Sequence, residues 1–282
     1  MPNFERLSMK GSGIFFDSAN LTELKKWYKT RILGGATTNP VILQKDGVFD
    51  IPTHIQNMIN IVGDGFPISI EIPDSRWTID QMTSLAVKYH NRFPNNAVIK
   101  IPMDPRDPEK AFEVIYKLGL EGVRINATVG LNVGQLIGAA ESLRMSKADG
   151  DNYVSLFWGR RNEAKNQIIE KKIEEARLTG KDDWSEVKET NLRQQLQTVI
   201  PDAAVTLAMT LNYLNTHSSA TRVIVGSVRS VEQIEQAFRV GSDIVTIPPQ
   251  LICDWMYTQK GVETVDQFNE AYASAKDKIT LI

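Results

Sequence analysis

The stretch AVIKIP, residues 97–102, has the composition of a fully buried strand with one lysine inside it. A buried ammonium group is costly unless it is paired or gives up its proton. Lys100 therefore either extends out of the core or has a chemical role, and the pattern of the surrounding sequence decides between these interpretations.

Short apolar runs like this one alternate with longer amphipathic stretches along the chain, as is typical of strand–helix units and a parallel sheet. The expected strands are GIFFD (13–17), GGATT (34–38), PISIEI (67–72), AVIKIP (97–102), GVRINATV (122–129), NYVSLFWG (152–159), RVIVGSV (222–228) and DIVTIPP (243–249). Eight units favour an α/β fold closed as a (β/α)8 barrel over an open doubly wound sheet, because no GxGxxG loop follows the first strand. The 282 residues suit a single domain, since such barrels often have about 250 residues.

Capping residues give the expected ends of several helices. Ser75 and Asp107 each precede an amphipathic stretch and are expected to start a helix, while Gly119 and Gly241 are expected to end one.

Residues 160–200 interrupt the regular alternation because they are rich in charged residues and helix formers. We expect a helical insertion after the sixth strand, which is either a solvated excursion, a lid over the site or an oligomer contact. A helical tail is expected over about 262–282.

Composition excludes several classes of protein. A net charge of −2 with scattered basic residues gives no electrostatic footprint for nucleic acid or an anionic membrane. The single cysteine cannot form an internal disulfide, and no apolar run approaches the roughly 18 to 20 residues of a membrane span. We expect a cytoplasmic protein.

Polar side chains lie near the carboxyl ends of the expected strands, where barrel enzymes build their active sites. Lys100 shares a strand face with Val98, and Asp17, Glu71, Asn126 and Thr128 lie at comparable positions. Among apolar neighbours and near other cations, the Lys100 amine is expected to become a nucleophile that forms a Schiff base with a carbonyl. A carboxylate, Asp17 or Glu71, would then remove a hydroxyl proton so that a C–C bond breaks.

Six motifs, in this order along the chain, resemble those of the transaldolase family. They are FFDSAN (15–20), GATTNP (35–40), VIKIP (98–102), INATV (125–129), SLFWGR (155–160) and GSVRSVEQIEQAFRVGSDIVTIPP (226–249). The resemblance covers roughly residues 13–257 and implies a barrel enzyme that requires no metal or other cofactor.

The resemblance implies a role for each matching residue. It makes Lys100 the Schiff-base lysine, Asp17 the acid/base at the substrate's C4 hydroxyl, and Glu71 with Thr128 the holders of a catalytic water. It places Thr38, Asn39, Asn126, Ser155 and Phe157 against the sugar, and Arg160, Ser227 and Arg229 against its phosphate.

The implied reaction transfers a dihydroxyacetone unit from fructose 6-phosphate or sedoheptulose 7-phosphate to erythrose 4-phosphate or glyceraldehyde 3-phosphate, as in the pentose phosphate pathway. Two alternatives stay open: a fructose-6-phosphate aldolase that releases free dihydroxyacetone, and a catalytically silent barrel that binds a sugar phosphate. The short aldolases of the family typically have glutamine in place of Glu71 and tyrosine in place of Phe157, which favours the transferase. Small sugar phosphates are the expected partners, and we expect a homo-oligomer.

Two residues depart from the family pattern. Leu156 and Trp158 stand where proline and valine are usual. Because Trp158 is close in sequence to Arg160, both departures bear on the shape of the pocket and on the preferred acceptor.

Overall fold

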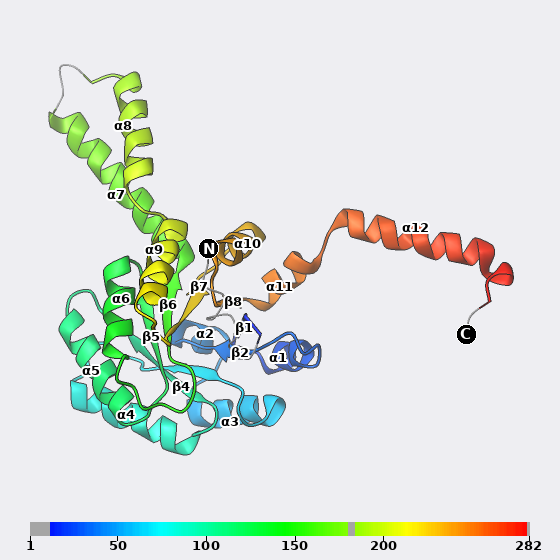
Figure 1. The fold of residues 1–282 in the computed structure, drawn as a ribbon, viewed down its shortest axis with the longest axis horizontal. Helices are drawn as coiled ribbons and strands as arrows, with labels where there is room; N and C mark the ends of the chain where they lie inside the picture. The colour runs from blue at the N-terminus through cyan, green and yellow to red at the C-terminus, as the bar shows by residue number, and fades with distance from the viewer. Residues whose placement is uncertain (1–11, 180–183, 281–282) are drawn as a thin grey trace.

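Eight parallel strands close into a barrel in the computed structural model, which describes residues 12–179 and 184–280 (Figure 1). The strands are β1 (Ile14–Asp17), β2 (Gly35–Thr37), β3 (Ile68–Glu71), β4 (Ala97–Pro102), β5 (Ile125–Gly130), β6 (Tyr153–Phe157), β7 (Arg222–Gly226) and β8 (Ile244–Ile247). Each strand pairs with its neighbours in the sequence, and β1 closes the barrel against β8 with Ile14 beside Val245. The predicted (β/α)8 fold is confirmed.

Helices surround this barrel and connect its strands. They are α1 (Leu21–Tyr28), α2 (Pro40–Lys45), α3 (Ile51–Val62), α4 (Ile79–Arg92), α5 (Pro108–Leu120), α6 (Val133–Ser142), α7 (Trp158–Thr179), α8 (Glu186–Val199), α9 (Ala203–Thr216), α10 (Val231–Val240), α11 (Pro249–Met256) and α12 (Gln259–Ala275), followed by the 3-10 turn η2 (Lys276–Lys278). Among the described residues, no helix combines the length and the apolar character that a membrane span requires.

Two of the four predicted helix ends are confirmed and two are wrong. Asp107 accepts the Lys110 N–H at 3.2 Å and starts α5, and Gly241 ends α10 with a left-handed φ of 102°. Ser75 does not start α4, because Thr78 forms a reciprocal capping box with the residue three positions later. Gly119 lies inside α5, which continues to Leu120.

The interior of the barrel is apolar only toward the amino ends of its strands. Phe15, Val98, Tyr153, Ile224 and Ile244 form a buried cluster there, separate from the larger core between sheet and helices. Because side chains alternate along a strand, Lys100 points to the same side as Val98 but two residues nearer the carboxyl end. The inner apolar cluster thus forms the floor beneath the polar residues of the site.

Two parts of the chain extend away from the barrel (Figure 1). Helices α7 and α8 form a hairpin that carries ion pairs from Glu189 to Arg177 (2.6 Å) and to Arg193 (3.4 Å). Helix α12 projects from another side, and none of its residues is buried. The expected insertion and tail each include residues outside the described ranges, namely 180–183 and 281–282.

Candidate active site

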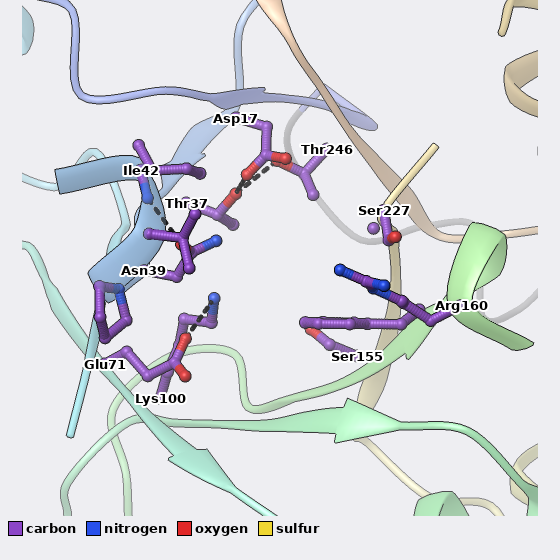
Figure 2. A pocket seen from close by; sticks show the side chains of 14 residues that line it. Asp17, Thr37, Asn39, Ile42, Glu71, Lys100, Ser155, Arg160, Ser227 and Thr246 are labelled. Atoms are coloured by element: carbon purple, nitrogen blue, oxygen red, sulfur yellow. Dashed lines mark hydrogen bonds and ion pairs between the residues drawn. The ribbon is translucent and has the colours of Figure 1, made fainter. Parts of the chain in front are cut away.

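A cavity of about 410 Å³ opens at the carboxyl ends of the strands. In the described part of the chain, every strand except β5 contributes to its lining. The lining residues are Asp17, Thr37, Asn39, Pro40, Val41, Ile42, Glu71, Lys100, Ser155, Phe157, Arg160, Gly226, Ser227 and Thr246. Figure 2 shows Lys100 and Glu71 on one side of this cavity and Arg160 with Ser227 on the other.

Lys100 is held at the cavity by two oxygen partners. Its Nζ lies 3.0 Å from Glu71 Oε2, with the side chains only 5% and 12% exposed, and it donates to the Thr38 carbonyl at 2.9 Å. Glu71 is its neighbour across the β3–β4 pairing, so strand register brings the two side chains together. In the described part of the chain, the cations expected near the amine do not contact it: its partners are a carboxylate and a carbonyl, while Arg160 lines the same cavity. Glu71 lies where it can take a proton from the amine.

Asp17 lies across the same cavity and is held by Thr37, which in turn contacts Thr246. Thr37 donates to its Oδ1 at 2.7 Å, and the Thr37 hydroxyl lies 2.6 Å from that of Thr246 (Figure 2). Burial raises the pKa of Asp17 above its usual range, while the hydrogen bond from Thr37 and the charge of Lys100 oppose this rise. The carboxyl group is therefore easier to protonate than an ordinary aspartate.

Sequence reasoning missed Thr37 and Thr246 and selected Thr38 instead. The Thr38 hydroxyl donates to the Ser69 carbonyl at 2.9 Å, so this residue serves the site through its own carbonyl rather than its side chain. Thr37 stands beside Asp17 in the register of β1 with β2, a signal that strand pairing could have supplied.

Amide and hydroxyl groups form the next part of the site. Ser155 donates to Asn126 Oδ1 at 2.7 Å, and Asn126 Nδ2 donates to Ser69 at 3.2 Å. Asn39 caps α2, because its Oδ1 accepts the Ile42 N–H at 2.9 Å. Its Nδ2 can then donate into the cavity, which the residue lines. Asn126 is fully buried and lies behind Ser155, whereas Ser155 and Asn39 line the cavity itself.

The end of β5 is deformed next to this network. Its pairing with β6 shifts between Ala127 and Gly130, and Val129 has a left-handed φ of 65°, which is unfavourable for a β-branched residue. Gly130 is required there, because a Cβ would lie 2.6 Å from the Ser155 carbonyl oxygen. The bulge leaves the Thr128 hydroxyl fully buried with no hydrogen-bond partner among the described residues.

A basic group lies at the outer side of the cavity. Arg160 and Ser227 line it, and the Ser227 carbonyl accepts the Gly159 N–H at 3.0 Å, which fixes the start of α7 against the end of β7. Arg229 does not line the cavity, because its guanidinium forms an ion pair with Glu163. Ten of the twelve predicted site residues thus lie around the cavity or directly behind it, Thr128 is buried at the β5 bulge, and Arg229 is turned toward Glu163.

A family-wide sequence profile for "Transaldolase/Fructose-6-phosphate aldolase" matches residues 14–280. The chain belongs to this family. It is 28% identical over 269 residues to a "Probable transaldolase" of Exiguobacterium sp., covering 94% of this chain and 99% of the relative. A "Probable transaldolase" of Thermoplasma volcanium is 29% identical, with 83% of each chain covered. One from Clostridium perfringens is 28% identical, with 92% of this chain and 98% of the relative covered.

The two departures from the transaldolase-family pattern do not line the cavity. Leu156 is fully buried in the core between sheet and helices, on the face of β6 opposite to Ser155. Trp158 is 1% exposed and belongs to the same core. The shape of the cavity is therefore set by its lining residues and not by Leu156 or Trp158.

Proposed function

We propose that this protein is a transaldolase that transfers a dihydroxyacetone unit between sugar phosphates through a Schiff base on Lys100. The observation that carries the proposal is the buried Lys100 amine, 3.0 Å from Glu71, in the cavity that Asp17 also lines. A nucleophile, a proton acceptor and a second carboxylate in one cavity are what Schiff-base chemistry requires.

Lys100 starts the reaction. Its proton passes to Glu71, and the free amine attacks the C2 carbonyl of the ketose phosphate to give a carbinolamine. Loss of water leaves an iminium that withdraws electrons from the neighbouring bonds. The 3.0 Å contact between Glu71 and the amine supports this first transfer.

Asp17 acts on the bond to be broken. Its carboxylate takes the C4 hydroxyl proton, the C3–C4 bond breaks, and the electron pair moves into the iminium to form an enamine while the aldose phosphate leaves. The enamine then attacks the aldehyde of the acceptor, and Asp17 returns the proton. The raised pKa of Asp17 suits a group that must take up and release a proton in each cycle.

Thr128 and Glu71 would hold the water that leaves and returns at the carbinolamine. The buried hydroxyl of Thr128 has no protein partner among the described residues, and buried polar groups are almost always hydrogen-bonded. A water between this hydroxyl and Glu71 would satisfy both groups.

The remaining residues of the cavity would bind the substrate. Asn39 and Ser155 present polar groups to the sugar hydroxyls, Phe157 supplies an apolar wall, and Arg160 with Ser227 faces the phosphate across the cavity from Lys100. Guanidinium groups suit phosphate because their paired N–H donors match its oxygens.

Borohydride trapping tests the mechanism. The protein is reduced in the presence of fructose 6-phosphate, and mass spectrometry of the digest is expected to show a reduced sugar adduct on Lys100. Lys110→Met is the matched control, since Lys110 lies outside the cavity and should leave the adduct unchanged. Absence of an adduct on Lys100 would mean that the barrel binds sugar phosphates without this chemistry.

The transferase is distinguished from the aldolase by its need for an acceptor. Cleavage of fructose 6-phosphate is measured with and without erythrose 4-phosphate. A transaldolase stalls after one turnover without the acceptor, because the enamine stays on Lys100. Continuous release of dihydroxyacetone without acceptor would identify an aldolase instead.

We also propose that the chain forms a homo-oligomer and that α12 contacts a second copy. This helix exposes an apolar stripe whose members are Val262, Val265, Phe268 and Tyr272, at 42%, 56%, 67% and 41% exposure. A helix of 17 residues with no buried side chain has little stability of its own. Outside the cavity, the barrel offers exposed apolar residues such as Phe49, to which the stripe of another copy is chemically matched.

Sedimentation analysis tests this contact. Phe268→Asp should shift the protein toward the monomer, whereas Gln267→Glu, which adds the same charge on the opposite side of the helix, should not. An unchanged assembly in both variants would remove α12 from the interface.

A further inference from the structure

Glu163 lies between Arg160 and Arg229, the two arginines that the family resemblance assigns to phosphate. It follows Arg160 by three residues in the first turns of α7, and its Oε2 lies 3.2 Å from an Nη1 atom of Arg160. Its other oxygen accepts a hydrogen bond from Nη1 of Arg229, which comes from the chain after β7. One carboxylate therefore bridges both guanidinium groups.

This bridge holds Arg229 away from the cavity. Neither Glu163 nor Arg229 is among the described residues that line it, although Ser227, two residues earlier, does. The Arg229 backbone is fixed, because its N–H donates to Gln233 at 3.0 Å. Its side chain lies over Gly159, where a Cβ would approach Nε to 3.0 Å. The side chain can therefore reach the cavity only by leaving Glu163.

The charges at this edge of the cavity are only partly balanced. Two guanidinium groups face one carboxylate, and the hydrogen bond from Arg229 keeps the pKa of Glu163 below its usual range, so Glu163 is ionised at neutral pH. All three side chains are substantially exposed, at 64% for Arg160, 48% for Arg229 and 40% for Glu163. Exposed ion pairs are weak and exchange partners readily.

We propose that Glu163 is a specificity-determining residue: an internal counterion that occupies Arg229 until the phosphate group of a substrate displaces it. This inference rests on the proposed function, because it concerns how the same site selects sugar phosphates. A phosphate monoester has a charge of about −1.5 to −2 at neutral pH and several acceptor oxygens. It can outcompete a single carboxylate for a guanidinium fork, whereas the hydroxyl of an unphosphorylated sugar cannot.

Titration calorimetry with inorganic phosphate tests the proposal on the full chain without any turnover. Glu163→Gln is expected to bind phosphate about threefold to tenfold more tightly than the wild type, because two exposed ion pairs no longer compete. Glu163→Ala should show the same direction of change. The gain should shrink at high salt, since screening weakens exposed charges.

Glu232→Gln is the matched control. Glu232 lies in the first turn of α10, near the same end of the barrel, and its carboxylate is hydrogen-bonded to Ser230 rather than to an arginine. Removing this negative charge should leave phosphate affinity at the wild-type value. An equal gain in this variant would show that net charge alone is responsible and would overturn the proposal.

Weaker or unchanged phosphate binding in Glu163→Gln would also overturn it, because Glu163 would then position the arginines rather than compete for them. Absence of phosphate binding in both proteins would have the same consequence. A failure of the proposed function shows separately, as a missing borohydride adduct on Lys100. The Michaelis constant for fructose 6-phosphate should fall in Glu163→Gln by the same factor as the phosphate dissociation constant.

Discussion

Replacing Lys100 by methionine tests whether Lys100 and Glu71 are a coupled, buried ion pair. The two side chains are 5% and 12% exposed and their charged atoms are 3.0 Å apart. Removing one partner of such a pair leaves a buried charge uncompensated, which costs about 3 to 5 kcal/mol. Because Glu71 also lines the cavity, water can approach it, and we expect a loss of about 3 kcal/mol, at the lower end of that range.

The same reasoning fixes the outcome of a double-mutant cycle. Glu71→Gln removes the other charge, and the combined variant Lys100→Met/Glu71→Gln leaves neither charge unpaired. We expect the combined variant to be more stable than Lys100→Met by about 2 kcal/mol or more. Lys110→Met is the control, because its pair with Asp107 is 3.3 Å long with 21% and 50% exposure and should contribute less than about 1 kcal/mol.

Urea unfolding followed by tryptophan fluorescence measures all four variants. A loss of 3 kcal/mol should also lower the melting temperature by roughly 6 °C or more. If Lys100→Met unfolds within about 1 kcal/mol of the wild type, and adding Glu71→Gln changes nothing, then the pair is not buried and coupled as described. The assignment of Glu71 as the first proton acceptor would then be refuted.

Three further substitutions have defined outcomes. Asp17→Asn should raise the melting temperature at pH 7, because the raised pKa of Asp17 means that its ionisation destabilises the fold. Calorimetric scans should show this gain shrinking as the pH falls toward the ordinary aspartate pKa. Below that pKa the carboxyl is protonated in both the folded and the unfolded state. Thr37→Val removes a hydrogen bond that lowers the pKa of Asp17, so the acid limb of the pH–rate profile should move to higher pH. Gly130→Ala places a Cβ 2.5 Å from a Leu136 methyl carbon and should cost about 1 to 3 kcal/mol in urea unfolding, whereas Gly134→Ala, inside α6, should be neutral or slightly stabilising.

The barrel could be predicted from sequence because its determinants are local. Each strand is a short apolar run bounded by polar residues, and the alternation of faces along β4 correctly placed Lys100 on the same side as Val98. The start of α4 was misplaced because Ser75 is a good capping residue by type. Thr78 is favoured by a second interaction, in which its backbone N–H donates to the Gln81 side-chain oxygen.

Residues whose roles depend on tertiary contacts were harder to assign. Choosing Thr37 over Thr38 requires the pairing of β1 with β2, since a strand of three residues gives little alternation to follow. Glu163 escaped notice because its second partner, Arg229, is 66 residues away in the sequence and reaches it only through the packing of the end of β7 against α7. Its contact with Arg160, one helical turn earlier, fits the helix that was expected over 160–200.

The junction between β6 and α7 joins the cavity to the projecting hairpin without any loop. Strand β6 ends at Phe157 and α7 begins at Trp158, a fully buried side chain. A straight helix of 22 residues is about 33 Å long at 1.5 Å per residue. A force applied near Thr179 is therefore transmitted along this stiff helix to Arg160. Insertions and deletions in the hairpin are tolerable far from Trp158 but not beside it.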